Sequence, residues 1–362
     1  MKTWDAIIIG AGIIGLSLAI ELRKRGLRVL VVEKGEPGRE ASWAAGGMLA
    51  DCGLEVPPAL RELATASARM YPEFVHELKD ESGLKIDLRD QGTVVLEDRN
   101  QGSERRGLAG ETPALLSSER LREMEPHLQT SVQAGFLKER SVDPRDLTTA
   151  AIRAAKHRGI DFSSGDEAVE VEIAEGRASG VRTKKTRFSA RAVVNCAGAW
   201  AGQIGPQRFP TRPVKGQMLC VVMPEKELVH HVVRAPEVYL IPRSDGRLLI
   251  GATLEEAGFD KHTVPATIQK LRQAALELAP KLAEARILEA WAGLRPGTPD
   301  GLPILGETTA RGYFVAAGHF RDGILLAPVT ARVMGQVLAG ERPEFDLKSF
   351  SATRAFEIDS KQ

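Results

Sequence analysis

The sequence is poor in cysteine. Its three cysteines, Cys52, Cys196 and Cys220, lie far apart among 362 residues and form neither a CxxC pair nor a zinc-binding spacing. This usage is typical of reduced, mostly buried thiols in a cytoplasmic protein. We therefore expect a cytoplasmic location, no metal site and no disulfide framework.

An excess of charge and long apolar runs are also lacking. The chain carries 49 basic and 48 acidic residues, so nothing suggests a nucleic-acid-binding face. No stretch approaches the ~20 apolar residues of a membrane span. The short apolar run near the start ends in a glycine turn instead of a signal-peptide cleavage site. With 43% hydrophobic and 27% charged residues, the length predicts a soluble globular protein of two domains.

A dinucleotide-binding pattern opens the chain. The run "AIIIG" is continuously apolar, as expected for a strand of a parallel sheet that is covered on both faces. A GxGxxG turn follows at Gly10, Gly12 and Gly15 and leads into a helix. Gly10 permits the tight turn, Gly12 lets the backbone approach a pyrophosphate, and Gly15 lets the helix pack close to the strand. The start of the helix offers N–H groups and a partial positive charge to the phosphates.

The second strand of this unit, "RVLVVEK", closes on Glu33. This residue lies 23 positions after Gly10, where a carboxylate can accept hydrogen bonds from both hydroxyls of a ribose. The same carboxylate would repel a 2′-phosphate, which argues against NADP. The unit predicts a bound dinucleotide, but it leaves the choice between FAD and NAD open.

The next segment, "GREASWAAGGMLAD" (38–51), is rich in Ala, Gly and Ser, so its backbone can lie flat along a ligand; a tightly packed surface loop is the alternative. The order of GxGxxG turn, acidic strand end and "REASWAAGGML" resembles the D-amino-acid oxidase family of flavoproteins, and within it the glycine oxidase branch of thiamine biosynthesis. Five later blocks resemble this family in the same order: "AVVNCAGAWAG" (192–202), "RPVKGQMLCV" (212–221), "VYLIPRSDGRLLIGAT" (238–253), "WAGLRPGTPDGLPILG" (291–306) and "YFVAAGHFRDGILLAP" (313–328).

The resemblance implies an α/β fold with two domains, of which one is Rossmann-like and binds FAD. The other is discontinuous, is built on a mostly antiparallel sheet and binds the substrate. The expected FAD-binding domain comprises residues 1–85, 140–212 and 290–362, and the substrate-binding domain comprises residues 86–139 and 213–289.

Local patterns agree with this organisation. Apolar residues at helical spacing predict a helix over 59–80 whose stripe is core packing. Asp143 suits the N-cap of a helix over 144–157, because a proline follows it. The segment 244–246 is a turn between strand-like runs, and an amphipathic helix is expected over 267–279.

The FAD is expected to be non-covalent, because no cysteine stands in the two C-terminal blocks. Three assignments have open alternatives: Val169 as a plain strand valine, Met48 as core filling and His319 as a packed loop residue. The residues that the resemblance assigns to the FAD site are Gly10, Gly12, Ile13, Ile14, Gly15, Glu33, Lys34, Ser42, Gly46, Gly47, Met48, Val169, His319, Phe320, Arg321, Asp322, Gly323, Ile324 and Leu325.

The block "GHFRDGILLAP" predicts a turn followed by a helix that starts near Gly323. The turn would expose the backbone N–H groups of Asp322, Gly323 and Ile324 at the N1/C2 carbonyl edge of the flavin. A helix N-terminus aimed there would stabilise the negative charge of reduced flavin.

The reaction that the resemblance implies moves a hydride from the α-carbon of glycine, sarcosine or a small D-amino acid to flavin N5. Water then hydrolyses the imine, and molecular oxygen reoxidises the flavin and yields hydrogen peroxide. The cofactor supplies the difficult chemistry, and the protein grips and orients the substrate. No side-chain general base is required.

Arg295 is the candidate carboxylate clamp. A cation is costly in a rigid, apolar segment unless it has an anionic partner, and a guanidinium binds a carboxylate with two parallel hydrogen bonds. A structural salt bridge is the alternative. The resemblance makes the Tyr239 hydroxyl a second carboxylate ligand, although a strand tyrosine alone suggests core packing. Arg321 would serve substrate, flavin or both. These three residues are the expected catalytic set.

Two substrate-side residues depart from the family pattern. Leu254 stands where we expect a methionine, and Glu237 stands where a histidine is expected. Both should lie near the substrate, so the substrate could differ from glycine. Glu237 could receive a second amine or repel acidic substrates.

Three other functions are compatible with these residues. A dehydrogenase of the same fold would pass electrons to a quinone or a partner protein, as a hydrogen-cyanide-synthase-like subunit does. A hydroxy-acid oxidase would use the same clamp, and a non-enzymatic flavin-binding scaffold would need none. The expected partners are a small amino acid or amine and molecular oxygen, with a homo-oligomer as a further possibility.

Overall fold

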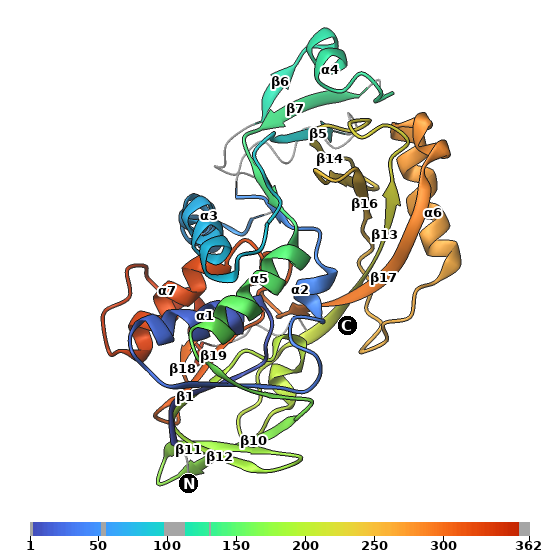
Figure 1. The fold of residues 1–362 in the computed structure, drawn as a ribbon. Coiled ribbons are helices and arrows are strands. Elements are labelled where there is room, and N and C mark those ends of the chain that lie inside the picture. The colour runs from blue at the N-terminus through green and yellow to red at the C-terminus, as the bar shows by residue number, and fades with distance from the viewer. Residues whose placement is uncertain (1–2, 52–55, 98–112, 130–131, 355–362) are drawn as a thin grey trace.

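The computed structural model describes residues 3–51, 56–97, 113–129 and 132–354, and its ribbon forms two lobes (Figure 1). The α-helices are α1 (Ile13–Lys24), α2 (Ala41–Ala44), α3 (Arg61–Ser82), α4 (Ser118–Met124), α5 (Pro144–His157), α6 (Pro265–Leu278) and α7 (Ala327–Leu338). The strands are β1 (Thr3–Ile9), β2 (Val29–Glu33), β3 (Met48–Leu49), β4 (Leu88–Arg89), β5 (Thr93–Glu97), β6 (Ala114–Leu116), β7 (Gln133–Leu137), β8 (Arg140–Val142), β9 (Asp161–Ser164), β10 (Ala168–Ala174), β11 (Arg177–Thr183), β12 (Arg187–Asn195), β13 (Arg212–Val222), β14 (Val232–Arg234), β15 (Tyr239–Pro242), β16 (Arg247–Gly251), β17 (Arg286–Gly297), β18 (Ile304–Glu307) and β19 (Tyr313–Ala317).

The first sheet has the strand order β10-β11-β12-β1-β2-β9, with β19 beside β12 and β18 beside β19. β1 pairs in parallel with both β2 and β12. Ala6 and Ile8 of β1 belong to the core under helices α1, α3, α5 and α7, whereas Ile7 and Ile9 pack with the β10–β11 hairpin. Because both faces are covered, the strand is apolar throughout.

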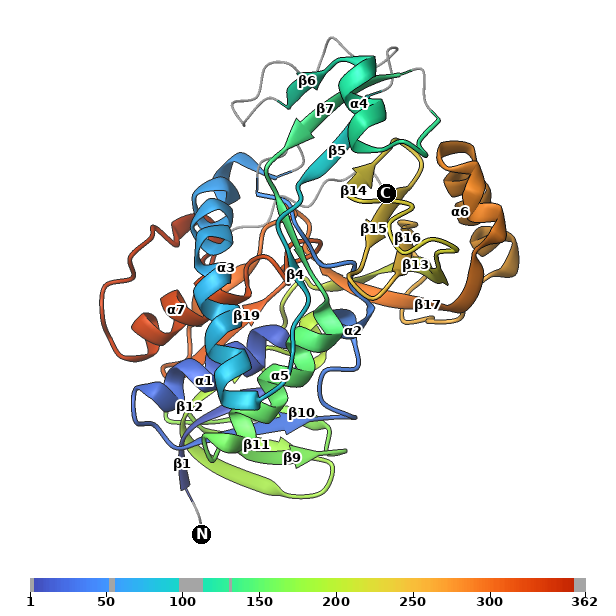
Figure 2. The same cartoon turned by 45° about the horizontal axis from the view of Figure 1, so that its top comes forward.

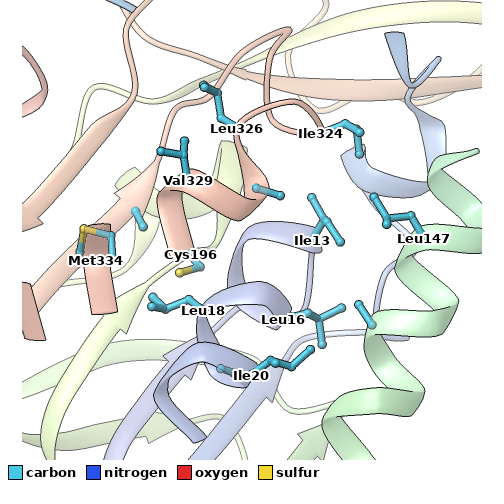
Figure 3. Close-up of a cluster of buried hydrophobic side chains, with 14 of the residues drawn as sticks. Ile13, Leu16, Leu18, Ile20, Leu147, Cys196, Ile324, Leu326, Val329 and Met334 are labelled. Carbon is cyan, nitrogen blue, oxygen red and sulfur yellow. The ribbon is translucent and has the colours of Figure 1, made fainter. Parts of the chain in front are cut away.

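Helices α1, α5 and α7 meet over this sheet. Figure 3 shows Ile13 and Leu16 of α1 near Leu147 of α5 and near Ile324, which precedes α7. These side chains are buried in one cluster. The packing fixes the start of α1 relative to the segment before α7, and both segments reach the site described below.

The second sheet has the strand order β17-β13-β16-β15-β14-β5-β7-β6. Its neighbours are antiparallel except for β14 and β5. Leu271 and Ala275 of α6 pack on it, and Figure 2 shows α6 beside β13 and β17 at the outer side of this lobe. A short sheet, β3-β8-β4, is formed by segments that connect the lobes. The predicted fold class, an α/β fold with a Rossmann-like domain and a second domain on a mostly antiparallel sheet, is confirmed. The first sheet is mixed, because β10–β11, β11–β12 and β18–β19 pair antiparallel.

Most local predictions agree with the structure. The helix expected over 59–80 is α3, preceded by a short 3-10 turn. The side chain of Asp143 accepts a hydrogen bond from the Arg145 amide at 2.9 Å and so caps α5. The amphipathic helix expected over 267–279 is α6, and the turn at 244–246 joins β15 to β16.

The predicted start of the last helix was wrong. This helix was expected near Gly323, but α7 begins at Ala327. The Leu326 amide bonds the Asp322 carbonyl as in a helix, but the Ala327 amide turns to the Ile324 carbonyl, which interrupts the helical ladder. Pro328 then suits the first turn of α7, where its missing N–H costs nothing.

The domain boundaries stay a prediction. β17 pairs with β13 from Arg286 to Gly297, so it belongs to the second sheet along its whole length. The expected boundary at residue 290 therefore falls inside a continuous strand. This strand carries the chain from the second sheet to the cavity between the lobes.

Two other expectations concern single features. Cys196 and Cys220 are buried and free, and Cys52 lies outside the described residues. Burial raises the pKa of the Cys220 thiol to about 11. Among the described helices, none combines the length and the apolar character needed to cross a membrane.

Candidate active site

A cavity of about 710 Å³ lies between the two sheets. Segments from both ends of the chain line it, including residues 12–14 and 319–324. Of the predicted site residues, only Gly15 and Leu325 are missing from its wall. Pockets of this kind, at the junction of two domains, are the usual place for a ligand.

The glycine-rich turn approaches the cavity as its spacing predicts. Gly10 has a φ of 104°, and an added Cβ would lie 2.5 Å from the Cys196 carbonyl oxygen. At Gly15 an added Cβ would overlap the Gly10 carbonyl and lie 3.1 Å from Ile8. Gly15 therefore serves close helix–strand packing and does not reach the ligand space.

Backbone amides near this turn are divided between protein and cavity. The Glu33 carboxylate accepts from the Ala11 amide at 2.8 Å and from the Gly35 amide at 3.0 Å. Ser42 Oγ accepts from the Ile13 amide at 2.9 Å, so this amide at the start of α1 is already used. Among the described residues, the Gly12 amide bonds no protein acceptor. This amide is available to a phosphate.

Lys34 forms part of the wall beyond Glu33. Its Nζ lies 3.0 Å from the centroid of the Trp200 ring and 3.5 Å from a carboxylate oxygen of Glu40. Burial lowers the pKa of Lys34, and Glu40 and Glu33 partly oppose this effect. Trp200 and Glu40 were not predicted as site residues. Both stand inside sequence blocks that resemble the family, which is the signal that could have found them.

The segment 319–326, here called the edge turn, closes the opposite side. The Asp322 amide donates to the His319 carbonyl at 2.9 Å, so it is engaged within the turn, contrary to expectation. The backbone amides of residues 323–325 donate to no acceptor in the described part of the chain. His319 is buried, and its Nε2 lies 3.1 Å from Thr330 Oγ1. Burial lowers the pKa of His319 to about 3, so its ring is neutral near pH 7.

Arg295 stands on β17 at the substrate side of the cavity. Its Nη1 donates to the Thr253 carbonyl at 3.0 Å and to the Lys215 carbonyl at 3.4 Å. Its guanidinium forms no ion pair with a carboxylate among the residues that the structure describes. A half-buried guanidinium held only by carbonyls keeps its charge available for an anion.

The segment that supplies the Thr253 carbonyl is anchored from β13. Lys215 is 1% exposed, and its Nζ lies 2.6 Å from an Asp260 carboxylate oxygen. The hydrogen bond from Lys215 holds the pKa of Asp260 well below its usual range. Gln217 is buried, accepts from the Val264 amide at 2.6 Å and donates to Glu255 at 2.8 Å. These contacts hold residues 253–264 against β13.

The other predicted substrate residues share the same wall. Tyr239 lies opposite Gly251 in the β15–β16 pair, and an added Cβ on Gly251 would lie 2.8 Å from its ring. Arg321 is exposed on the edge turn. Glu237 is exposed, and Leu254 is 56% exposed at the mouth of the cavity.

Arg234 lines the cavity but was not predicted. Its Nη2 lies 3.5 Å from Glu139 Oε1, and the Glu139 side chain is almost fully buried. The two residues are separated by 95 positions in the chain. No local sequence pattern predicts this pair, because Glu139, between β7 and β8, and Arg234, on β14, are distant in sequence.

Arg243 was also missed, and it supports the cavity from behind. It is 1% exposed; Nη2 donates to the Gly46 carbonyl at 2.6 Å and Nη1 to the Val142 carbonyl at 3.1 Å. Burial lowers the pKa of Arg243, and Asp143, with an oxygen 3.7 Å from Nε, opposes this effect. The β15–β16 turn thereby fixes the loop that carries Gly46 and Met48.

A model of the family described as "FAD dependent oxidoreductase" matches residues 5–337. The chain belongs to this family. The resemblance noted in the sequence is thereby confirmed, and FAD is the cofactor of the family.

Individual relatives narrow the class. The glycine oxidase of Geobacillus kaustophilus is 34% identical over 97% of both chains, and its crystal structure superposes with a TM-score of 0.92 over 98% of this chain and 100% of that one. A bifunctional ThiO/ThiG protein of Trichormus variabilis is 35% identical over 97% of this chain, which spans 55% of its length. The hydrogen cyanide synthase subunit HcnC of Pseudomonas aeruginosa is 31% identical over 98% of this chain and 96% of its own length. These relatives support the prediction of a FAD-dependent amino acid oxidase of the glycine oxidase type.

The residues present fit FAD. The Gly12 amide is open at one side of the cavity, and the amides of residues 323–325 are open at the edge turn. The Glu33 oxygens, each bonded to one amide, can still accept from ribose hydroxyls. A side chain at Gly10 would collide with the Cys196 carbonyl, so the tight turn that presents the Gly12 amide requires glycine at this position.

Proposed function

We propose that the protein oxidises the C–N bond of glycine, sarcosine or another small amino acid. The observation that carries this proposal is the half-buried guanidinium of Arg295, which is held by two carbonyls and shares a cavity with the open amides of the edge turn. A carboxylate bound by Arg295 would lie in the same enclosed space as the cofactor. Such a substrate must therefore be an acid that carries its reactive carbon next to the carboxylate.

The roles of the residues follow from their chemistry. Arg295 grips the substrate carboxylate with its remaining donors, and the Tyr239 hydroxyl bonds a second carboxylate oxygen. Arg321, on the edge turn, adds positive charge close to substrate and cofactor. FAD, when bound, accepts the hydride of the α-carbon at N5.

Proton transfer needs no dedicated base in this scheme. The substrate amine enters in its neutral form, and after hydride loss its nitrogen releases one proton to solvent. His319 is neutral and already faces Thr330, so it keeps the edge turn in place without exchanging protons. Water enters through the mouth at Leu254 and Glu237 and hydrolyses the imine. With oxygen as the acceptor, the electron pair leaves as hydrogen peroxide.

A dehydrogenase is the second candidate, and the 31% identity to the subunit HcnC supports it. It would use the same clamp and the same edge turn. The difference lies in the electron acceptor, which would be a quinone or a partner protein instead of oxygen.

One experiment tests both candidates. The purified protein is mixed anaerobically with glycine, sarcosine, D-alanine, D-proline or L-proline, and loss of visible flavin absorbance reports reduction. Oxygen is then added in a stopped-flow instrument. Reduction by at least one of these acids with rapid reoxidation supports the oxidase. Reduction with slow reoxidation favours the dehydrogenase, and no reduction by any acid would contradict both.

A further inference from the structure

Two buried hydroxyl groups lie behind the edge turn. Ser67 and Tyr71 stand four residues apart on α3, so their side chains share one face of that helix. Both residues are 0% exposed. Neither touches the cavity, and the mechanism proposed above does not use them.

These hydroxyls hold two consecutive carbonyls of the edge turn. Tyr71 Oη donates to the Ile324 carbonyl at 2.5 Å, and Ser67 Oγ donates to the Leu325 carbonyl at 2.6 Å. Ser67 Oγ also accepts from the Val329 amide at 3.3 Å, in the first turn of α7. One face of α3 therefore fixes both the edge turn and the start of the helix behind it.

The orientation of the carbonyls determines that of the amides. The C=O and N–H of one trans peptide unit point in opposite directions, so the bond from Tyr71 turns the Leu325 amide away from α3. Gly323 and Ile324 line the cavity. For all three amides, 323 to 325, the described residues provide no acceptor. Buried amides in proteins nearly always find a partner, so the two that belong to the cavity wall, at Gly323 and Ile324, indicate a ligand acceptor.

We propose that Ser67 and Tyr71 are positioning residues that set how strongly the edge turn stabilises negative charge on the flavin. The Leu326 amide, which belongs to the peptide unit that Ser67 holds, bonds the Asp322 carbonyl, and Leu325 does not line the cavity. The two hydroxyls therefore act by fixing the turn that presents the Gly323 and Ile324 amides. Fixed donors aimed at developing charge need no rearrangement when the charge appears. The inference rests on the proposed function only in that FAD fills this cavity, and it is independent of which amine is oxidised.

The test uses the FAD-loaded enzyme and inorganic sulfite. Sulfite adds reversibly to flavin N5 and leaves negative charge at the N1–C2 edge, so its Kd reports stabilisation of that charge. Tyr71→Phe and Ser67→Ala each remove one hydroxyl and no other polar group. We expect each to raise the sulfite Kd about three- to tenfold, the effect of one buried hydrogen bond. The FAD Kd, measured by titrating apoprotein, should rise in the same direction.

Two matched controls separate this role from general stability. Tyr313→Phe removes a buried hydroxyl that contacts Asn195 instead of the edge turn. Ser17→Ala removes a buried hydroxyl that has no hydrogen-bond partner among the described residues. Both controls should leave the sulfite Kd unchanged.

Variants at residues 67 and 71 that lower Tm but leave the sulfite Kd at the wild-type value would overturn the inference. If Tyr71→Phe does not fold, Ser67→Ala decides the question by itself. No amino acid substrate enters this measurement. A protein that meets the sulfite expectation but is reduced by no amine would therefore contradict only the proposed function.

Discussion

Gly216 lies directly against the guanidinium group of Arg295. A Cβ added to Gly216 would come within 2.5 Å of both Cζ and Nη2, and still closer to Nη1. The buried side chains of Lys215 and Gln217 anchor β13 on either side, so the strand cannot move aside. The position of the clamp therefore depends on the absence of a side chain on the neighbouring strand.

Gly216→Ala should displace the Arg295 guanidinium while FAD stays bound. We expect kcat/KM for carboxylated substrates to fall roughly 10- to 100-fold, because a charge-assisted hydrogen bond in a closed site contributes about 1.5–3 kcal/mol. Steady-state kinetics and flavin absorbance measure the two quantities. Gly205→Ala is the control, since its added Cβ has its nearest neighbour 4.0 Å away. Unchanged kinetics in Gly216→Ala would contradict the predicted contact.

Arg295→Ala should raise KM strongly for carboxylated substrates without releasing FAD. The rise in KM should be much smaller for a substrate analogue that has a methyl group in place of the carboxylate, because Arg295 does not bind that analogue. Measuring KM for both substrates in wild type and in Arg295→Ala isolates the contribution of the contact between Arg295 and the carboxylate. Equal losses for both substrates would show that Arg295 acts on something other than the carboxylate.

Glu33→Gln should weaken FAD binding more than it alters the chemistry of the saturated enzyme. Glu33 is buried and accepts two backbone amides, and an amide side chain can accept at one end only. We expect about a tenfold rise in the FAD Kd, measured by quenching of flavin fluorescence on apoprotein. Glu36→Gln, at an exposed glutamate paired with Arg39, is the control. An unchanged Kd would mean that the ribose is held elsewhere.

Stability should decline in acid partly through His319. Its pKa in the folded protein is about 3, below the ordinary 6.5, so only the unfolded chain takes up this proton as the pH falls. The contribution of His319 to the free energy of unfolding is complete above pH 6.5. Below that pH it decreases by about 1.4 kcal/mol per pH unit. Between pH 3 and pH 6.5, the free energy of unfolding in urea should depend less steeply on pH in His319→Gln than in wild type. His76→Gln, at an exposed histidine, should behave like wild type.

Arg243→Ala should destabilise the protein by about 3–5 kcal/mol, as expected when one partner of a buried ion pair is removed. The loss leaves Asp143 less compensated and frees the Gly46 and Val142 carbonyls. Urea unfolding measures the change. Arg187→Ala, at an exposed arginine, should change stability by well under ~1 kcal/mol. Similar values for the two variants would refute a supporting role for Arg243.

The parts of the fold that sequence reasoning predicted are those with local signals. The GxGxxG turn, the acidic end of β2 and the Asp143 cap each lie within a few residues of the element they define. Family blocks added the edge turn and Arg295, and all but two of the assigned residues line one cavity. Their individual roles in binding and catalysis stay predictions.

What was missed depends on contacts between distant strands. Gly216 meets Arg295 only because β13 and β17 pair in one particular register. Arg243 looks like an ordinary turn arginine in the sequence, and its burial follows from the docking of the β15–β16 turn on Gly46 and Val142. The last helix was predicted to start near Gly323 because the sequence does not reveal the distant α3 hydroxyls. These hydroxyls hold carbonyls of the turn before α7.

The strand order of the first sheet also limits when the cofactor can bind during synthesis. β1 needs β12 beside it, and β12 in turn borders β19, which ends at Ala317. A ribosome adds about 5–20 residues per second, so β19 and the edge turn are synthesised on the order of tens of seconds after the glycine-rich turn. Until the edge turn has emerged, the N-terminal half offers FAD an open surface instead of a cavity. Flavin capture is therefore a late event that follows synthesis of the edge turn.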